Sequence, residues 1–542
     1  MESRPLVVVG AGIAGTAAAI EAAKTGVHVT LIDENPIPTS IVDLNVPQLF
    51  GQRYTGNLRD KSAMMENVVA ANKSLAEAEQ ASVDIQLGTC VWGAFGNSDT
   101  SRLLDGPQIG LANYQWSWMI KFDRLIVATG ARDLSIGFAG WQLAGAIGAN
   151  GAHSLMHRYH ALSSRRVVIL GSGNLGLNTA KMALDNGIEI AAIVETSSSL
   201  QGDESLMAEL QNQGVELYTS HTVSEASGTD HDIESVVLVE IDDDNNPVAS
   251  TEKIIPTDTV CLAVGLVPNL ELLSLLGCDL TFNPGLGGHL PNHDDWMRTS
   301  IDNVFIAGDV AGFHDAMILD PSIARNQGRI AGLSAAESLG AIDNPEAQSR
   351  ISDIQQGLYE SPGFPPLAGE MSEGQRGAKP PTGEMSEEQR GTKPLADAIS
   401  NRKKWLHSLA NSSGQDIFAC RCEEVTRAEI VGLQPPRYLE WESAQMNQRS
   451  LQTQLEDNPI NPNQVKRLTR AGTGICQGRH CREQVALLLA EEANAEVAEI
   501  PLMTYRPPVR PLPLNVMWPD DETDQIRNEW PKWFSPTSKV LG

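Results

Sequence analysis

"VVVGAGIAGTAAAIEAAKTGVHVTLIDE", residues 7–34, decides the fold of the N-terminal part of this 542-residue chain. It predicts a buried strand, a G-x-G-x-x-G turn, an Ala-rich helix and a second strand that ends in acidic residues. In such a turn Gly10 allows the tight bend, Gly12 lets the backbone approach a pyrophosphate, and Gly15 lets the helix pack against the strand. Asp33, followed by Glu34, ends the second strand, where a carboxylate can accept ribose hydroxyls. The stretch therefore predicts a dinucleotide-binding domain.

The same pattern recurs in "RRVVILGSGNLGLNTAKMALDNGIEIAAIVE", residues 165–195. Gly171, Gly173 and Gly176 form the predicted turn, and Glu195 ends the strand that follows. An acid at this position favours an unphosphorylated ribose, so NAD would be preferred over NADP if a nicotinamide cofactor binds. ATP or ADP could satisfy the same contacts, and a folded domain without a ligand is the third alternative.

The composition is that of a soluble globular protein, with 41% hydrophobic residues. At about 100–200 residues per domain, the length suggests roughly three domains. The net charge of −28 repels nucleic acid and anionic membrane surfaces, and we exclude nucleic acid as a partner. The first strand begins at Leu6, which leaves no room for a signal peptide, and no apolar run reaches the roughly 18 residues of a membrane span. We expect a cytoplasmic protein.

Four of the seven cysteines lie in the last quarter of the chain. "FACRCEEV" carries Cys420 and Cys422, and "GICQGRHC" carries Cys476 and Cys481. Only one residue separates Cys420 from Cys422, whereas the C-x-x-C pairs typical of zinc sites have two. The spacing therefore favours a binuclear iron-sulfur cluster in which each iron takes two thiolates. Zinc is the alternative. Cys481 also begins a predicted helix, "REQVALLLAEE", whose free amides would favour an anionic cluster.

Further motifs in the first 340 residues resemble, in their order, the two-dinucleotide-domain flavoprotein family. They are "LIVATGARD" (125–133), with Thr129 and Gly130, "TVCLAVGLVPN" (259–269), and "NVFIAGDVAG" (303–312), with Gly308 and Asp309. The resemblance implies FAD in the first domain, with Asp309 at its ribityl-phosphate part. Disulfide reductases of this family carry a paired-cysteine motif, and this chain has none before residue 420. Thiol-disulfide chemistry is therefore not expected, and Cys261 and Cys278 are predicted to be small buried residues.

A second resemblance covers the C-terminal part. "CRCEEVTRAEI" (420–430) and "NPNQVKRLTRAGTGICQGRHC" (461–481) look like the bacterioferritin-associated-ferredoxin-like 2Fe-2S module. The form resembled is the one fused to alpha subunits of heteromeric dye-linked dehydrogenases, which act on amino acids, hydroxyproline and opines and include the cyanide-forming glycine dehydrogenase. "FAGWQLAGAIGANGAHSL" (138–155) and "RPPVRPLPL" (506–514) also look like segments of those subunits. The resemblance makes Cys420, Cys422, Cys476 and Cys481 the cluster ligands.

The chain departs from that family in three places. "PIPTSIVDLNVPQLFGQRY" (36–54) replaces a "GGQIYR"-like stretch, which leaves contacts to the flavin ring there in doubt. Ala139 replaces a proline in the "FPGW" motif. A tandem repeat, "GEMSEGQRGAKP" from Gly369 and "GEMSEEQRGTKP" from Gly383, forms an insert within 369–394 that is too polar and too short to build a solenoid.

The expected fold is α/β, with two Rossmann-like dinucleotide-binding domains in a disulfide-reductase-like flavoprotein arrangement and a small helical 2Fe-2S domain. We predict an FAD-binding domain over 1–140 and 280–340, and a second nucleotide domain over 141–279. A polar linker with the repeat follows over 345–410. The iron-sulfur domain covers 415–495 and a proline-rich tail covers 496–542.

In the resembling complexes the alpha subunit does not oxidise the substrate. A beta subunit related to glycine and D-amino-acid oxidases does so with its own FAD. Electrons then pass, in several members through an FMN at the interface, to the FAD and cluster of the alpha chain and on to an external acceptor. A small third subunit is left open. The resemblance therefore predicts an electron-transferring subunit of an amine or amino-acid dehydrogenase. The alternatives are a self-sufficient NAD(P)H-dependent ferredoxin- or rubredoxin-type reductase, and a scaffold whose second site holds ATP structurally.

Overall fold

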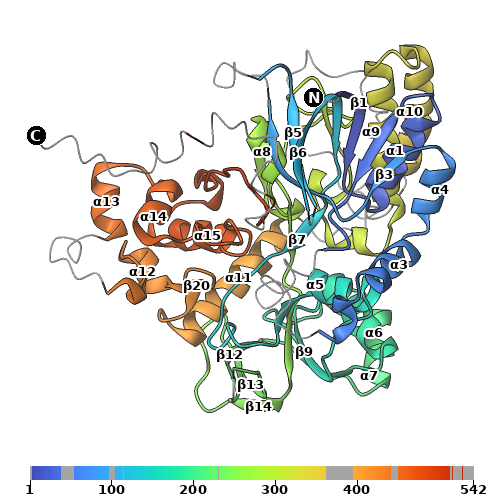
Figure 1. Cartoon of the computed structure of the whole chain (residues 1–542). Helices are drawn as coiled ribbons and strands as arrows, with labels where there is room; N and C mark the ends of the chain where they lie inside the picture. The colour runs from blue at the N-terminus through green and yellow to red at the C-terminus, as the bar shows by residue number, and fades with distance from the viewer. Residues whose placement is uncertain are drawn as a thin grey trace, which may run out of the picture.

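The structure is a computed structural model that describes most of the chain. The described residues are 3–37, 54–96, 104–113, 115–229, 231–359, 361, 395–440, 450–512, 516 and 528. The tandem repeat and most of the departure at 36–54 lie outside them. Two α/β domains and a helical domain lie side by side, with the helical domain in orange and red at the left of Figure 1.

The first α/β domain is built on a sheet of seven strands in the order β3-β2-β1-β6-β5-β4, with β19 also paired to β6. Strands β1, β2, β3, β6 and β19 run parallel, and β4 and β5 extend the sheet antiparallel. Helices α1 and α9 pack against each other on one face. The bounds are β1 (Ser3–Val9), α1 (Ile13–Ala23), β2 (Val29–Ile32), β3 (Asp84–Gln86), β4 (Cys90–Phe95), β5 (Gln108–Ala112), β6 (Ser117–Val127), β19 (Val304–Ile306) and α9 (Ser322–Ser338).

The second α/β domain has a parallel sheet in the order β11-β10-β9-β15-β8 and a separate three-stranded antiparallel sheet, β12-β13-β14. Both parallel sheets follow from runs such as 6–9 and 167–170, whose side chains are buried on both faces. The bounds are β8 (Ala146–Gly148), α5 (Ala149–His153), β9 (Arg166–Leu170), α6 (Asn174–Asp185), β10 (Glu189–Val194), α7 (Glu204–Asn212), β11 (Leu217–Tyr218), β12 (His221–Ser227), β13 (Ser235–Glu240), β14 (Lys253–Pro256) and β15 (Thr259–Leu262). Two Rossmann-like sheets were predicted, and this prediction is confirmed.

The domain limits differ from the predicted ones in two places. Leu270, Leu272 and Leu273, around α8 (Glu271–Leu276), pack in the first core, before the predicted return at residue 280. The predicted linker, 345–410, begins and ends in helices. Helix α10 (Asn344–Tyr359) buries Ile351 on the first core, and α11 (Leu395–Ser413) buries Trp405 on the second domain. Both helices carry apolar stripes that the polar composition of the whole segment obscured.

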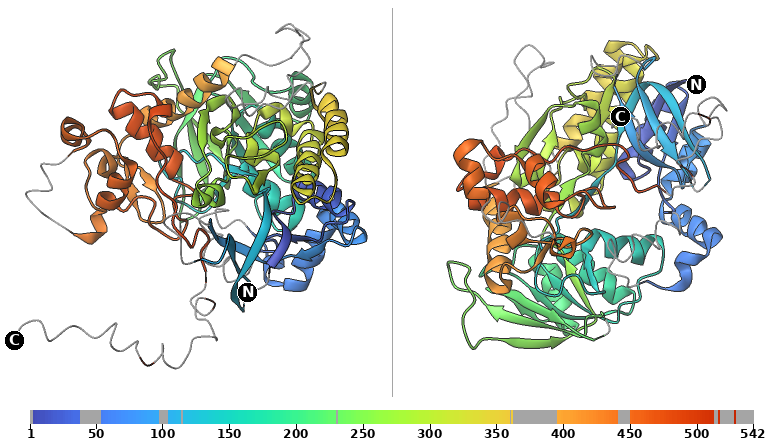
Figure 2. Two further views of the ribbon diagram at one scale, coloured as in Figure 1. Left: turned by 90° about the horizontal axis from the view of Figure 1, so that it is seen from above. Right: turned by 60° about the vertical axis from the view of Figure 1, so that its left-hand side comes forward.

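The helical domain, described over 417–440 and 450–500, is here called the cysteine domain because it holds all four clustered thiols. Its core is formed by apolar side chains of short helices around β20 and β21. Figure 2 shows the domain, in orange and red, beside the green strands of the second domain. The bounds are β20 (Phe418–Cys420), β21 (Val425–Thr426), α12 (Arg427–Val431), α13 (Leu451–Asp457), α14 (Pro462–Thr469) and α15 (Arg482–Glu492).

Within the described ranges, no helix is long and apolar enough to cross a membrane.

Candidate functional site

The first Gly-rich turn opens onto a cavity of about 410 Å³, here called the dinucleotide cavity. A Cβ atom added to Gly12 would meet no other atom within 4 Å, whereas one added to Gly15 would lie 1.8 Å from the Gly10 carbonyl oxygen. Gly12 therefore leaves space for a ligand, and Gly15 allows helix α1 to pack on the turn. The predicted residues that line the cavity are Gly10, Gly12, Asp33, Glu34, Thr129, Gly130 and Asp309.

Two of these residues are held in place by their own contacts. Asp33 accepts hydrogen bonds from the amides of Ala11, at 2.6 Å, and Asn35, at 2.8 Å. Thr129 donates to the carbonyl oxygen of Asn269 at 3.1 Å, which ties the "ATG" turn to the end of the second domain. These contacts fix polar groups around the wall of the cavity before any ligand enters.

Two partly buried carboxyl groups also line the dinucleotide cavity. Burial raises the pKa of Asp309 to about 6. Burial also raises the pKa of Asp133 to about 6, although Asp133 accepts hydrogen bonds from the amides of Asn150 and Gly151 at 2.8 and 3.1 Å. Gly308, next to Asp309, has a φ of +78° and donates its amide hydrogen to Gln327 Oε1 at 3.1 Å. Gly308 thus turns the chain so that Asp309 reaches the cavity.

The second Gly-rich turn has the same backbone shape but different surroundings. A Cβ atom on Gly176 would lie 2.1 Å from the carbonyl oxygen of Gly171, which matches the packing role of Gly15. Glu195 is fully buried and accepts hydrogen bonds from the Ser172 amide at 3.0 Å and the Ser197 amide at 2.9 Å. A Cβ atom on Gly173 would lie 3.2–3.4 Å from the carboxyl group of Asp315. Asp315 was not singled out from the sequence.

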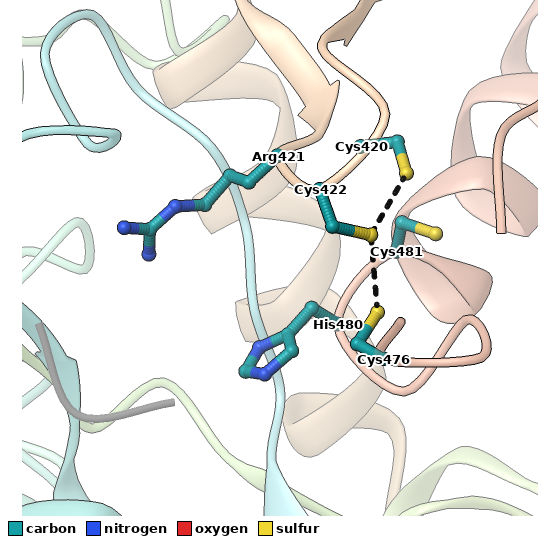
Figure 3. Close-up of a pocket in the computed structure, with 6 residues that line it drawn as sticks. All are labelled: Cys420, Arg421, Cys422, Cys476, His480 and Cys481. Atoms are coloured by element: carbon teal, nitrogen blue, oxygen red, sulfur yellow. Dashed lines mark hydrogen bonds between the residues drawn. The ribbon is translucent and has the colours of Figure 1, made fainter. Parts of the chain in front are cut away.

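The structure brings the four clustered thiols together, although Cys422 and Cys476 are far apart in the chain. Cys420, Cys422, Cys476 and Cys481 line one small cavity with Arg421 and His480, here called the thiol cavity (Figure 3). The Sγ atom of Cys422 lies 3.9 Å from that of Cys420 and 3.5 Å from that of Cys476. Among the described residues, no group of three or more His, Cys, Asp or Glu side chains is arranged to hold a metal ion.

Backbone amides approach the thiols closely. The amide of Gly472 donates to the Sγ atom of Cys420 at 3.5 Å. A Cβ atom on Gly474 would lie 2.5 Å from the Sγ atom of Cys422, so only glycine allows this approach. The hydrogen bond with Cys420, together with burial, raises the pKa of Cys422 to about 12. The thiol of Cys422 is therefore held in the protonated form.

His480 lines both cavities: it precedes Cys481 in the loop that closes the thiol cavity, and its ring points away from the four sulfur atoms (Figure 3). Its Nε2 atom is buried and has no hydrogen-bond partner among the described residues. Burial, with the charges of Arg421 and Arg479, lowers the pKa of His480 to about 3, so the ring is neutral. The sequence places His480 beside Cys481 but contains no signal that it would line two cavities.

The C-terminal strip, residues 506–512, lies against the dinucleotide cavity and contributes three lining residues, 509–511. Arg510 Nε donates to Glu34 Oε2 at 2.8 Å, and the amide of Val509 donates to the carbonyl oxygen of Trp92 at 2.8 Å. The proline-rich sequence predicted an extended segment, but not that it would become part of a site.

The lone cysteines behave as small apolar residues. Cys261 and Cys278 are buried, and burial raises the pKa of Cys278 to about 11. The prediction that both are small buried residues is confirmed.

Two known families match parts of the chain. Residues 4–340, more than half of the chain, match the family described as "Pyridine nucleotide-disulphide oxidoreductase". Residues 447–520 match the family described as "Sarcosine oxidase A3 domain".

Several individual proteins are similar over most of the chain. An opine oxidase subunit of Rhizobium meliloti is 25% identical over 525 residues, which cover 94% of this chain and 86% of that protein. The hydrogen cyanide synthase subunit HcnB of Pseudomonas protegens is 25% identical over 547 residues, which cover 95% of this chain and 98% of that protein. The crystal structure of L-proline dehydrogenase from P. horikoshii has a TM-score of 0.57 at 16% identity, covers 95% of this chain and 80% of that one, and shows likeness of fold alone.

Proposed function

The chain belongs to the pyridine nucleotide-disulphide oxidoreductase family, and from this we propose that it is the electron-transferring subunit of a heteromeric amine or amino-acid dehydrogenase. The chain is an oxidoreductase, and relatives similar along its length are named as subunits of an opine oxidase and of a hydrogen cyanide synthase. In the proposal, a partner subunit oxidises the substrate and this chain conducts the electrons to an external acceptor.

The first domain fits FAD. The space beside Gly12, the N-terminus of helix α1 and the half-buried Asp33 suit a pyrophosphate and a ribose. Thr129 and Asp309 line the same cavity further along. The unpartnered Nε2 atom of His480 offers one further hydrogen bond to a bound ring. We propose that these residues hold FAD in the dinucleotide cavity.

Four thiols around one small cavity support an iron-sulfur cluster. Two thiolates bound to the same iron at about 2.3 Å lie about 3.8 Å from each other, close to the 3.9 Å between the Sγ atoms of Cys420 and Cys422. The amide of Gly472 and the N-terminus of α15, which begins just after Cys481, stabilise negative charge on sulfur. Buried Arg479, whose pKa burial lowers to about 10, also benefits from a nearby anion. We propose that Cys420, Cys422, Cys476 and Cys481 hold a 2Fe-2S cluster.

The observation that carries the proposed function is the position of His480 between the two cavities. FAD exchanges electrons in pairs and a 2Fe-2S cluster exchanges them singly, which is the chemistry that the two groups would supply when bound. His480 and the loop from Cys476 to Cys481 separate the two sites by a single layer of protein. A chain that holds two redox groups this close is suited to conduct electrons.

The remaining parts of the proposal concern partners. We propose that the partner is an FAD-containing beta subunit related to glycine and D-amino-acid oxidases, with FMN at the interface in the manner of the resembling complexes. The complex is proposed to act in the cytoplasm. The names of the relatives support a multi-subunit enzyme, because both the opine oxidase and the hydrogen cyanide synthase relatives are named as subunits.

The first test is the cofactor content of the purified full-length chain. We expect about one FAD and about two iron atoms with matching acid-labile sulfide per chain, and a paramagnetic signal from the cluster after reduction with dithionite. The absence of both flavin absorbance and the cluster signal would overturn the proposal. Prompt bleaching of the flavin by NADH without a partner would instead favour the self-sufficient reductase.

The second test concerns His480. In the variant His480→Leu we expect the iron content to be unchanged, because His480 is not one of the four thiols, and the variant is compared with the wild type after both are saturated with FAD. The rate at which a one-electron acceptor reoxidises the reduced protein should fall roughly tenfold, which corresponds to about 1.4 kcal/mol in the barrier. An unchanged rate in a fully loaded variant would show that electrons take another route.

A further inference from the structure

The carboxyl group of Asp315 lies at the N-terminus of helix α6, in the second α/β domain. Its Oδ2 atom accepts a hydrogen bond from the amide of Asn174 at 2.7 Å, and its Oδ1 atom accepts one from the amide of Leu175 at 3.1 Å. In G-x-G-x-x-G folds these first amides of the helix bind the pyrophosphate of the ligand. A side-chain anion of this chain therefore occupies the position at which a ligand anion would bind.

The first domain provides an internal comparison, because it has the same turn. Gly12 has open space above it and lines the dinucleotide cavity. Gly173, its counterpart, has the Asp315 carboxyl group at 3.2–3.4 Å from the position of a Cβ atom. The two turns thus share a sequence pattern and a backbone shape, but only the first has space for a phosphate.

Glu195, the counterpart of Asp33, is fully buried beneath the second turn, whereas Asp33 is half-buried and lines the dinucleotide cavity. Both carboxylate oxygens of Glu195 accept hydrogen bonds, Oε2 from the Ser172 amide and hydroxyl group at 3.0 and 2.8 Å and Oε1 from the Ser197 amide at 2.9 Å. The amide of Gly202 donates to the carbonyl oxygen of Ser172 at 2.9 Å, and a Cβ atom on Gly202 would lie 2.9 Å from the amide nitrogen of Asn174. The segment around Gly202 therefore also packs against the turn, in addition to Asp315.

We propose that Asp315 is an internal anion that closes the second dinucleotide site, so that this chain excludes NAD, NADP and ATP from it. A dinucleotide could enter only by displacing the carboxylate from two charge-assisted hydrogen bonds and then placing its pyrophosphate beside the displaced charge. The second α/β domain accordingly serves as a structural body, and nicotinamide does not deliver electrons to this chain. This inference goes beyond the proposed function and is tested by ligand binding alone, so either can fail without the other.

The position of Asp315 in the chain adds a structural role. Asp315 begins the short helix η5 (Asp315–Ile318), six residues after Asp309, which lines the dinucleotide cavity of the first domain. The bonds from Asp315 to helix α6 therefore join the two α/β domains beside the proposed FAD site. Closing the second site and fixing the two domains to each other are two effects of the same carboxylate.

The test is calorimetric titration of the full-length, FAD-loaded chain with NAD and, separately, with ATP. The variants are Asp315→Ala and, as a matched control, Asp320→Ala. The control removes the same negative charge from the same stretch of the chain. The Asp320 side chain, however, only caps Ser322, whose amide donates to it at 3.0 Å. We expect Asp315→Ala to bind at least one ligand about tenfold or more tightly than the wild type and the control, because the competing anion is gone. Equal affinities in a folded, FAD-loaded variant would overturn the proposal.

A second measurement needs no variant. Nucleotides released by denaturing the wild-type protein are separated by chromatography, and we expect FAD without NAD, NADP or ATP. Any of these three at a level comparable to FAD would overturn the proposal. If Asp315→Ala does not fold, Asp315→Asn keeps the shape of the side chain and removes its charge, and the same gain in affinity, although smaller, is expected from it.

Discussion

Gly137 donates its amide hydrogen to Oε1 of Gln484 at 2.6 Å, in a buried hydrogen bond that joins the second α/β domain to helix α15. The carbonyl oxygen of Gly137 accepts a second hydrogen bond, from Nη2 of Arg427, also at 2.6 Å. Trp141 completes the contact by donating from Nε1 to the carbonyl oxygen of Phe418 at 2.8 Å. One peptide segment thus fixes the orientation of the cysteine domain relative to the two α/β domains.

We predict that Gln484→Leu destabilises the protein. The substitution leaves the buried amide of Gly137 without a partner, and such a loss costs about 1–3 kcal/mol. The free energy of unfolding in urea measures the effect. The matched control is Gln452→Leu, because Gln452 is exposed and its Nε2 atom donates only to the carbonyl oxygen of Glu492. An equal effect of both substitutions would contradict the assigned role of Gln484.

We predict that Cys476→Ser abolishes the iron and sulfide content and leaves FAD bound. Cys476 lies beside the Sγ atom of Cys422 and does not line the dinucleotide cavity. Elemental analysis and flavin absorbance measure the two cofactors independently. The matched control is Cys278→Ser, because Cys278 is buried but lies outside the thiol cavity. Loss of iron from this control as well would point to a folding defect rather than a lost ligand.

We predict that Arg510→Ala weakens FAD binding. Arg510 pairs with Glu34 at 2.8 Å and keeps the C-terminal strip against the dinucleotide cavity. The pair is partly exposed, so its loss should reduce FAD affinity about fivefold, which corresponds to about 1 kcal/mol. The dissociation constant is measured by flavin fluorescence. Lys121→Ala removes a surface pair with Asp105 and should leave FAD binding unchanged.

We predict a pH-dependent stability that originates at Asp133. Its pKa in the folded chain, about 6, lies above the ordinary value of 3.8, so the folded state binds this proton more tightly than the unfolded state. The contribution of Asp133 to the stability of the folded chain is therefore most favourable below about pH 4 and is lost as the pH rises through 6. Urea unfolding of the FAD-free chain should show this fall in the wild type, and Asp133→Asn should reduce it to the part that comes from Asp309, whose pKa is also raised to about 6.

Asp203 changes the stability with pH in the opposite direction, and it serves as the control for the measurements on Asp133. The hydrogen bond from Ser205 lowers the pKa of Asp203 below its ordinary value of 3.8. The contribution of Asp203 is therefore present above that value and lost as the pH falls below it. Asp203→Asn should leave the change between pH 4 and 6 in place. If it removes that change, the assignment to Asp133 is wrong.

Local patterns in the sequence predicted local structure well. The stretch "TRAE", residues 426–429, has the pattern of a capping box, and both hydrogen bonds of the box are present at the start of α12. Pro462 stands at the first position of α14, where proline is typical, and the predicted helix "REQVALLLAEE" is the whole of α15. These features depend on residues within one or two turns of each other, so a single stretch of sequence contains all of the information.

Contacts between distant residues could not be read in the same way. Asp315 and Asn174 are 141 residues apart, and Arg510 and Glu34 are 476 apart. Neither pair has a spacing or composition that marks it, because only the assembled domains bring the partners together. The second Gly-rich turn matched its motif in every position, yet its surroundings decide whether a ligand has space.

The C-terminal strip bears on how the protein is made. Residues 509–511 line a cavity whose first wall is the turn at Gly10 and Gly12, so nearly the entire chain separates the two halves of one site. During synthesis the cavity cannot be complete until Pro511 has left the ribosome. If FAD binds there as proposed, its site is completed late in synthesis, and a chain shortened before residue 509 would lack part of the cavity wall and bind flavin more weakly.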